Sequence, residues 1–503
     1  MLKPHLLLAI GLIVFAGVYG VRAQDLDFKS TGAPLKAAPA DREIASALSK
    51  VSAEKIHQNI ETLVNFKNRM ATSSMDTDLP PGTGILAAAA YIKGQFEAIS
   101  KDCGGCLEVK EDIFIQPATD SPGSRIAQDT KLINVYAILK GTDPAQAQRM
   151  YLVTGHYDTR VTNMNDTHDF APGANDDTSG TAVSMECARV LSKHKFPATI
   201  VFAAVDAEEE GLFGSAHLAK LAKDEGWDLE GVLNNDIVGG NTTPGETHQS
   251  KTLVRVFSES VPQNATVEEM RRLILYGNED DSPSRELARE ILDVARGYFP
   301  QASGTIPPTS LKAVMEMRLD RYGRGGDHRS FNEQGFSAVR FTEWREDYHH
   351  QHQDVRVENE IQYGDLLQFD DFNYIAKVAR LNAATLATMA SAPGSPKAVT
   401  MAGRSQGNDS VIKFTAPEGA PAGAWYQVVW RETDASDWQY GANASNYNDT
   451  IEGTTHTITV PISKDNVYFG IRSCDSKGNC STAVAPAPEI PSRNGPRPGT
   501  PRS

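Results

Sequence analysis

The spacing of apolar residues follows two different patterns along the chain. Between about residues 45 and 390, short apolar runs alternate with segments in which apolar residues recur at helical spacing. The runs at 133–139, 151–155, 200–205, 232–238 and 338–341 are predicted strands. Strands that alternate with helices are typical of a sheet covered by helices on both faces. This region therefore predicts a three-layer α/β/α sandwich with a mixed, largely parallel central sheet.

Helical segments can be placed within the same region. Ser52 is suited to cap a helix with one apolar face. That face is formed by Ile56, Ile60, Leu63 and Val64. Two more helices are predicted over residues 86–99 and 372–390. Helices rich in Glu and Arg at about 266–297 give no indication of what they pack against.

The spacing of apolar residues changes after the stretch 391–397, which contains Pro and Gly and is a predicted linker. Alternating segments follow at 411–414, 425–430, 457–460 and 467–471, separated by clusters of Gly, Asn, Asp and Ser. Residues 398–485 are therefore expected to form an all-β, immunoglobulin-like sandwich. The stretch 468–479 resembles the late strands and turn of fibronectin type III domains.

Both ends of the chain differ from these regions. Lys3 precedes an apolar run at 6–20, and Val21 and Ala23 supply the small residues of a cleavage site. The run is shorter than the ~20 residues that span a bilayer, so residues 1–23 are a predicted signal peptide cleaved after Ala23. We expect a secreted or periplasmic protein without a membrane span. Residues 24–40 are a predicted flexible leader or part of a propeptide, and residues 486–503 a predicted disordered, Pro-rich tail.

The cysteines agree with export. Cys103 and Cys106 lie close in sequence, as do Cys474 and Cys480, and an oxidising compartment allows each pair to form a small disulfide loop. A redox motif at Cys103 is the alternative, but no thioredoxin-like strand and helix surround it. Cys187 is expected to be a buried free thiol.

Composition narrows the class of partner. The chain has 503 residues, 40% of them apolar, so it is long enough for more than one packed core. Its formal charge of -15 has the wrong sign for a surface that neutralises phosphates, so nucleic acid is not an expected partner. The sequence does not indicate an oligomeric state.

Polar residues gather where the predicted strands end. His156 and Asp158 follow the run at 151–155, and the acidic stretch 206–210 follows the run at 200–205. Ligands bind at the carboxyl ends of parallel strands. A surface histidine near an aspartate is common, however, and a solvated loop would also explain the acids. Neither cluster alone indicates a site.

Three further clusters complete the set. Asp176 and Asp177 precede a predicted helix, where they could cap its N-terminus or hold cations. Asp236 lies at the end of another predicted strand. The segment 348–354 contains three histidines, which are His349, His350 and His352. Carboxylates and imidazoles at several strand ends are the donors that a zinc centre with an open position uses.

The order of these motifs resembles a known family. Residues 155–158 read GHYD, 172–180 PGANDDTSG, 206–215 DAEEEGLFGS, 234–236 NND and 349–354 HHQHQD. As an ordered set they resemble the di-zinc aminopeptidases of metallopeptidase family M28, over roughly residues 45–390. The segment GDHRSF at 326–331 is similar to that family's GSDHxPF, with Gly326 where the family often has Ser.

The resemblance implies a role for each matching residue. Two zinc ions would be held, with Asp176 bridging them. The other expected ligands are His156 and Asp236 on one ion, and Glu209 and His350 on the other. Glu208 would be the general base and Asp158 the partner that orients His156. The family places its last histidine four residues before an Asp, which His350 and Asp354 satisfy. His349 and His352 are the alternatives.

The same resemblance implies the activity. Residues 41–390 would be a zinc peptidase domain that hydrolyses N-terminal peptide bonds through a metal-bridged hydroxide. The expected partners are peptides or proteins with a free N-terminus.

Three other functions fit less well. Glutaminyl cyclases share the fold but use one zinc ion, and a non-catalytic binding module should lack ligands or the base. A serine hydrolase could use Ser405 in GRSQG, yet this stretch lacks the strand and helix of a nucleophile elbow.

Overall fold

The structure is a computed structural model that describes residues 26–37, 40–119, 124–299, 306–320, 325–402 and 407–489. The predicted signal peptide and most of the predicted tail lie outside these residues, as does Ser405 of the alternative serine motif. Within the described ranges, no helix combines the length and the apolarity needed to cross a bilayer.

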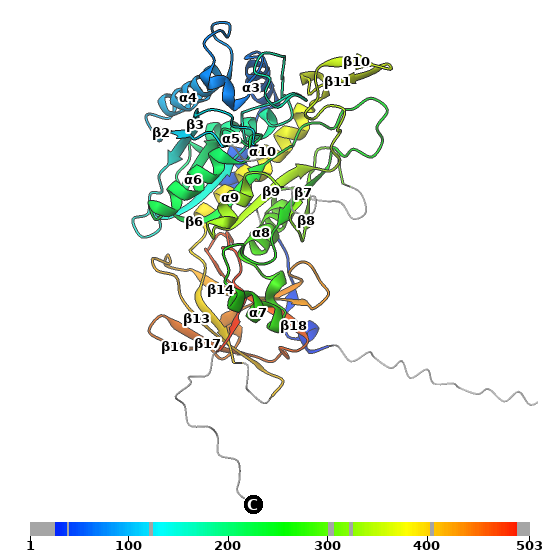
Figure 1. The fold of residues 1–503 in the computed structure, drawn as a ribbon. Coiled ribbons are helices and arrows are strands. Elements are labelled where there is room, and N and C mark those ends of the chain that lie inside the picture. Colours follow the sequence, from blue (N-terminus) through cyan, green and yellow to red (C-terminus); the bar gives the residue numbers. More distant parts are fainter. Residues whose placement is uncertain are drawn as a thin grey trace, which may run out of the picture.

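An eight-stranded mixed sheet forms the centre of the larger part of the molecule (Figure 1). In sheet order its strands are β2 (Leu107–Gln116), β3 (Thr130–Leu139), β5 (Thr199–Ala204), β4 (Arg149–Thr154), β6 (Asp228–Asn235), β9 (Ala338–Glu343), β7 (Leu253–Ser258) and β8 (Lys312–Glu316). Strands β5, β4, β6 and β9 are parallel neighbours, and β7 is parallel to β8. The other pairs are antiparallel. The predicted fold class is confirmed, although β2, β7 and β8 were not predicted.

Helices cover both faces of this sheet. One face carries α2 (Arg42–Leu48), α3 (Ala53–Val64), α4 (Ile85–Asp102), α5 (Thr178–Leu191), α8 (Pro283–Tyr298) and α10 (Phe372–Ser391). The other carries α6 (Phe213–Asp224) and α9 (His328–Glu333). Strand β5 serves both cores, because Ile200 and Phe202 pack on one side while Val201 and Ala203 pack on the other. A sheet buried on both faces is typical of parallel strands.

Local signals place the helix starts. The Ser52 hydroxyl accepts a hydrogen bond from the amide of Lys55, so α3 begins where the sequence predicted. The four apolar residues of its predicted face are buried.

Two smaller sheets form a second unit, built mostly from residues after α10, which Figure 1 draws largely in orange and red, and completed by β1, which is drawn in blue. One has the order β16 (Thr450–Glu452), β17 (Thr455–Val460), β13 (Ser410–Thr415), β12 (Lys397–Met401) and β19 (Ala487–Pro488). The other has the order β1 (Ala33–Pro34), β15 (Tyr440–Asn443), β14 (Trp425–Glu432) and β18 (Val467–Cys474). Ile412 and Ile458 of the first sheet share a core with Trp430 and Phe469 of the second. The predicted β-sandwich is present, and its likeness to fibronectin type III domains stays a prediction.

The first described residues belong to this sandwich. They form α1 (Asp27–Ser30) and strand β1, which pairs with β15. The indole nitrogen of Trp430 donates a hydrogen bond to the carbonyl of Phe28 at 2.8 Å, and the Phe28 ring is buried in the sandwich core. A Cβ on Gly32 would lie 2.1 Å from the same indole, so only glycine fits there. The prediction of a flexible leader is therefore wrong for residues 26–37. At the other end, β19 carries the sandwich past residue 485.

The Glu- and Arg-rich segment that had no predicted neighbour lies between the two units. It forms α7 (Val267–Tyr276) and α8. The buried face of α8 contributes Leu287 and Ile291 to the core of the large sheet. Its acidic residues instead meet arginines of the sandwich, and Asp293 lies 2.9 Å from Arg472.

Both predicted disulfides are present, and Cys187 is a buried free thiol as expected.

Candidate metal centre

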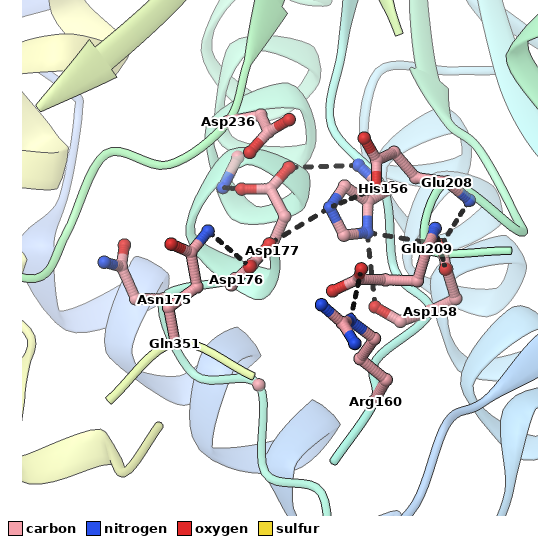
Figure 2. A network of polar contacts seen from close by, with 12 residues as sticks. His156, Asp158, Arg160, Asn175, Asp176, Asp177, Glu208, Glu209, Asp236 and Gln351 are labelled. Atoms are coloured by element: carbon pink, nitrogen blue, oxygen red, sulfur yellow. Dashed lines mark hydrogen bonds and ion pairs between the residues drawn. The ribbon is translucent and has the colours of Figure 1, made fainter. Parts of the chain in front are cut away.

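Three neighbouring parallel strands deliver the first candidate residues. His156 follows β4, Glu208 and Glu209 follow β5, and Asp236 follows β6. Because these strands are adjacent and parallel, their carboxyl ends meet at one edge of the sheet. The sequence prediction that polar residues cluster there corresponds to a real juxtaposition (Figure 2).

The next two candidate residues, Asp176 and Asp177, lie at the N-terminus of α5 and make different contacts. Asp177 caps the helix, since its carboxylate accepts hydrogen bonds from the amides of Gly180 and His156, each at 3.0 Å. Asp176 turns the other way and places Oδ1 3.2 Å from Nε2 of His156. Capping and cation binding were alternatives in the sequence. The structure shows Asp177 as the cap and places Asp176 among the candidate metal donors.

Asp176 belongs to two groups of possible metal donors at once. One group is His156, Asp176 and Asp236, and the other is Asp176, Glu209 and His352. In each group the donor atoms lie within 4.8 Å of one another. The shared carboxylate is the arrangement expected of a bridging ligand.

The position of the late histidine corrects the prediction of His350. Nε2 of His352 lies 2.8 Å from Asp176 and 2.7 Å from Glu209. His350 instead stacks on the ring of Phe369, with centroids 3.6 Å apart, and faces Asp347. The backbone of His352 has a φ of 60°, and this left-handed turn points its ring toward the acids. His349, the other alternative, pairs with Asp347.

Asp158 and Glu208 lie beside the donors without joining either group. Oδ1 of Asp158 lies 3.2 Å from Nδ1 of His156, and its two oxygens accept hydrogen bonds from the amides of Glu208 and Glu209. Asp158 thus orients both the imidazole and the loop after β5. The carboxylate of Glu208 is 3.9 Å from Nε2 of His156, on the same side as Asp176.

The electrostatics of the cluster call for cations. Burial opposes protonation of His352, but the charges of Glu209 and Asp176 outweigh burial and raise the pKa of His352 to about 10. Burial also opposes ionisation of Asp176, yet the two imidazoles hold the pKa of this carboxyl well below its usual value. The carboxylates therefore draw positive charge into a buried place.

The donor set fits divalent metal ions. Nε2 of His156 and Oε1 of Glu209 are buried and make no hydrogen bond to any described residue, although each lies close to another donor atom. Such atoms converge on the space between them, and imidazole with carboxylate is a donor combination that zinc takes.

Sequence reasoning missed several residues that hold the donors in place. The guanidinium of Arg340 donates to Asp236 at 2.9 Å, and the amide of Gln351 donates to Asp176 at 2.8 Å. Asp365 accepts from the backbone amide of Asp176 at 2.7 Å. Arg340 carried a signal, because an arginine within the apolar run 338–341 needs a buried acceptor. Gln351 stands within the histidine segment itself.

Gly326 explains a departure from the family motif. A Cβ at this position would lie 2.3 Å from Oδ2 of Asp236, so the serine that the family often carries would collide with a candidate ligand. The adjacent Asp327 and His328 are fully buried.

Comparison with known proteins places the chain in a family. The sequence profile of peptidase family M28 matches residues 134–371. A probable zinc metalloprotease of Leptosphaeria maculans is 38% identical over 449 residues, which are 89% of this chain and 97% of that protein. The chain belongs to peptidase family M28. Members of this family hydrolyse peptide bonds, and both the expected family and the enzyme class are confirmed.

Two further similarities were found. A probable zinc metalloprotease of Pyricularia oryzae is 40% identical over 454 residues, covering 89% of this chain and 85% of that protein. The crystal structure of the Legionella pneumophila LapA aminopeptidase is 18% identical, with a TM-score of 0.47, and covers 78% of this chain and 80% of that chain.

Proposed function

We propose that the chain is an exported, zinc-dependent aminopeptidase with two zinc ions. The observation that carries this proposal is the pair of donor groups that share Asp176. His156 and Asp236 would hold one ion, Glu209 and His352 the other, and Asp176 both. The curated relatives are named zinc metalloproteases, which supports zinc over other divalent ions.

Zinc ions, when bound, lower the pKa of water and polarise a carbonyl group. The chain's own residues then account for proton movement and orientation. Glu208 accepts a proton from the attacking water and delivers it to the nitrogen of the leaving amine. Its neighbour Asp158 fixes the backbone amide of Glu208, which limits where this carboxylate can reach.

Removal of the first residue, and not of an internal one, rests on the resemblance to M28 aminopeptidases. Export rests on the predicted signal peptide and is supported by the two disulfides, which require an oxidising compartment.

The test combines metal counting with hydrolysis. Purified protein should contain two zinc ions per chain, lose hydrolysis of leucine p-nitroanilide when a chelator strips them, and recover it when zinc is returned. A peptide with a free N-terminus should lose its first residue, whereas the N-acetylated form of that peptide should resist cleavage of its first bond. Full activity of the stripped protein would refute the metal mechanism, and equal cleavage of the acetylated peptide would refute the aminopeptidase assignment.

A further inference from the structure

The cavity over the candidate ligands has a distinctive charge balance. It encloses about 330 Å³, and its lining includes Arg125, Arg160, Arg329 and Arg340. Its acidic lining residues are the candidate ligands and the candidate base, namely Asp176, Glu208, Glu209 and Asp236. Across the described residues, the lining has no further acid that could receive a positively charged substrate side chain.

Arg340 pairs with carboxylates of the protein and is not a candidate for binding substrate. Its guanidinium lies 2.9 Å from Asp236 and 2.7 Å from Asp320, and its side chain is almost fully buried. The other three arginines are more exposed and line the cavity wall.

Arg160 contacts a candidate ligand and is less buried than Arg340. Its Nε donates a hydrogen bond to Oε2 of Glu209 at 2.9 Å, and Figure 2 shows its guanidinium directed toward that carboxylate. One terminal nitrogen faces Nδ1 of His352. If Nε2 of His352 holds a metal ion, Nδ1 carries the ring proton and cannot accept a hydrogen bond. That end of the Arg160 guanidinium then has donors available for an anion.

Arg125 lines the same cavity. One of its terminal nitrogens contacts the backbone carbonyl of Glu209, so two guanidinium groups flank one candidate ligand. The planar fork of a guanidinium matches a carboxylate in two parallel hydrogen bonds. A carboxylate entering this cavity would therefore meet paired donors beside the candidate ligand Glu209.

We propose that the cavity recognises a substrate carboxylate close to the scissile peptide bond, with Arg160 as the main contact and Arg125 beside it. This inference rests on the proposed peptidase function and narrows its substrate class. Two sources supply the same chemistry. The carboxylate is the side chain of an acidic first residue, or it is the terminal carboxylate of a dipeptide.

Matched substrates separate the two sources. The first pair is aspartyl and asparaginyl p-nitroanilide, and the second is Ala-Ala and its C-terminal amide. A charge-assisted hydrogen bond is worth about 1.5–3 kcal/mol, so the anionic member of one pair should have a kcat/KM about tenfold or more above its neutral partner. The pair that shows this preference identifies the source. A ratio of one or less in both pairs would overturn the proposal.

Substitution tests the residue. Arg160→Leu should bring the preferred ratio close to one, and Arg160→Lys should keep part of it because the charge remains without the fork. Arg345→Leu is the matched control, since Arg345 lies outside this cavity and pairs with Glu246 at the surface. An unchanged ratio in folded Arg160→Leu would refute the role of Arg160.

A binding measurement keeps this inference separate from the proposed function. Calorimetric titration should show tighter binding of aspartate than of asparagine, or of a reduced-amide Ala-Ala analogue than of its C-terminal amide. The difference should disappear in Arg160→Leu. If the protein cleaves no substrate, the proposed function fails while these affinities still decide the inference. Equal affinities within both pairs, or no binding, would reject it.

Discussion

Two buried clusters of acidic residues occupy this protein, and they differ in what balances them. At the interface between the units, Asp281 lies 2.6 Å from Arg431, and Glu290 and Asp293 both face Arg472. At the sheet edge, Asp176, Glu208 and Glu209 crowd around imidazoles. At the interface, arginine side chains of the protein balance the charges of the acids. The sheet edge has donor atoms left over. Burial of acids alone therefore does not mark a metal site. What distinguishes the sheet edge is that carboxylate and imidazole donor atoms converge there.

The largest expected effect comes from the proposed base. Glu208→Gln keeps the shape of the side chain and the hydrogen bond from the backbone amide of residue 208 to Asp158. The new side chain cannot accept a proton, so we expect kcat to fall by about 10²–10⁴-fold. Zinc content per chain should stay unchanged, which elemental analysis of the same sample measures. Glu225→Gln, at the end of α6, is the control. A near-normal rate in Glu208→Gln would remove the base from the mechanism.

The next comparison sets two neighbouring histidines against each other. His352→Ala should lose zinc and activity, because it removes a donor from the group with Asp176 and Glu209. His350→Ala should keep its zinc and lose only the stacking on Phe369. Zinc per chain after dialysis, measured side by side, checks this order. The reverse result would restore the original prediction that His350 is the ligand.

Breaking the internally balanced cluster should cost stability while the metal centre stays intact. Arg472→Met leaves Glu290 without the cation it faces and Asp293 with only the more exposed Arg296, 3.3 Å away. Losing one partner of a buried pair costs about 3–5 kcal/mol. Urea unfolding measures the loss. Arg356→Met, on the exposed hairpin of β10 (Arg356–Glu358) and β11 (Ile361–Tyr363), should change the free energy of unfolding by less than about 0.5 kcal/mol. Equal effects in both variants would contradict the comparison.

The smallest effect concerns a buried acid that belongs to neither cluster. Burial raises the pKa of Glu259 to about 8, while Ser284 donates only a long hydrogen bond of 3.4 Å. The folded state therefore binds more protons than the unfolded state between pH 4.5 and 8, and this contribution to stability is lost as pH rises through that window. As the pH is raised from 5 to 8.5, the free energy of unfolding of Glu259→Gln should therefore increase relative to that of the native chain, as urea unfolding at each pH would measure. Exposed Glu268→Gln, on α7, should show no such trend.

Much of the fold could be predicted because buried parallel strands appear as uninterrupted apolar runs, as in β4 and β5. Strand β2 was missed because charged residues interrupt its apolar ones. Ligands that directly follow strands were predicted from position and from the family resemblance together. His352 was not chosen, because the turn that aims its ring depends on backbone conformation that spacing does not reveal. The interface and the pairing of β1 depend on partners distant in sequence, which local patterns do not identify.

The pairing of β1 with β15 makes the α/β unit an insertion within the sandwich. The segment that leaves the ribosome soon after the predicted signal peptide cannot complete its hydrogen bonds until a strand about 400 residues later has been synthesised. Maturation of the sandwich is thus postponed until nearly the whole polypeptide has emerged. A chain shortened at either extremity would damage the same module.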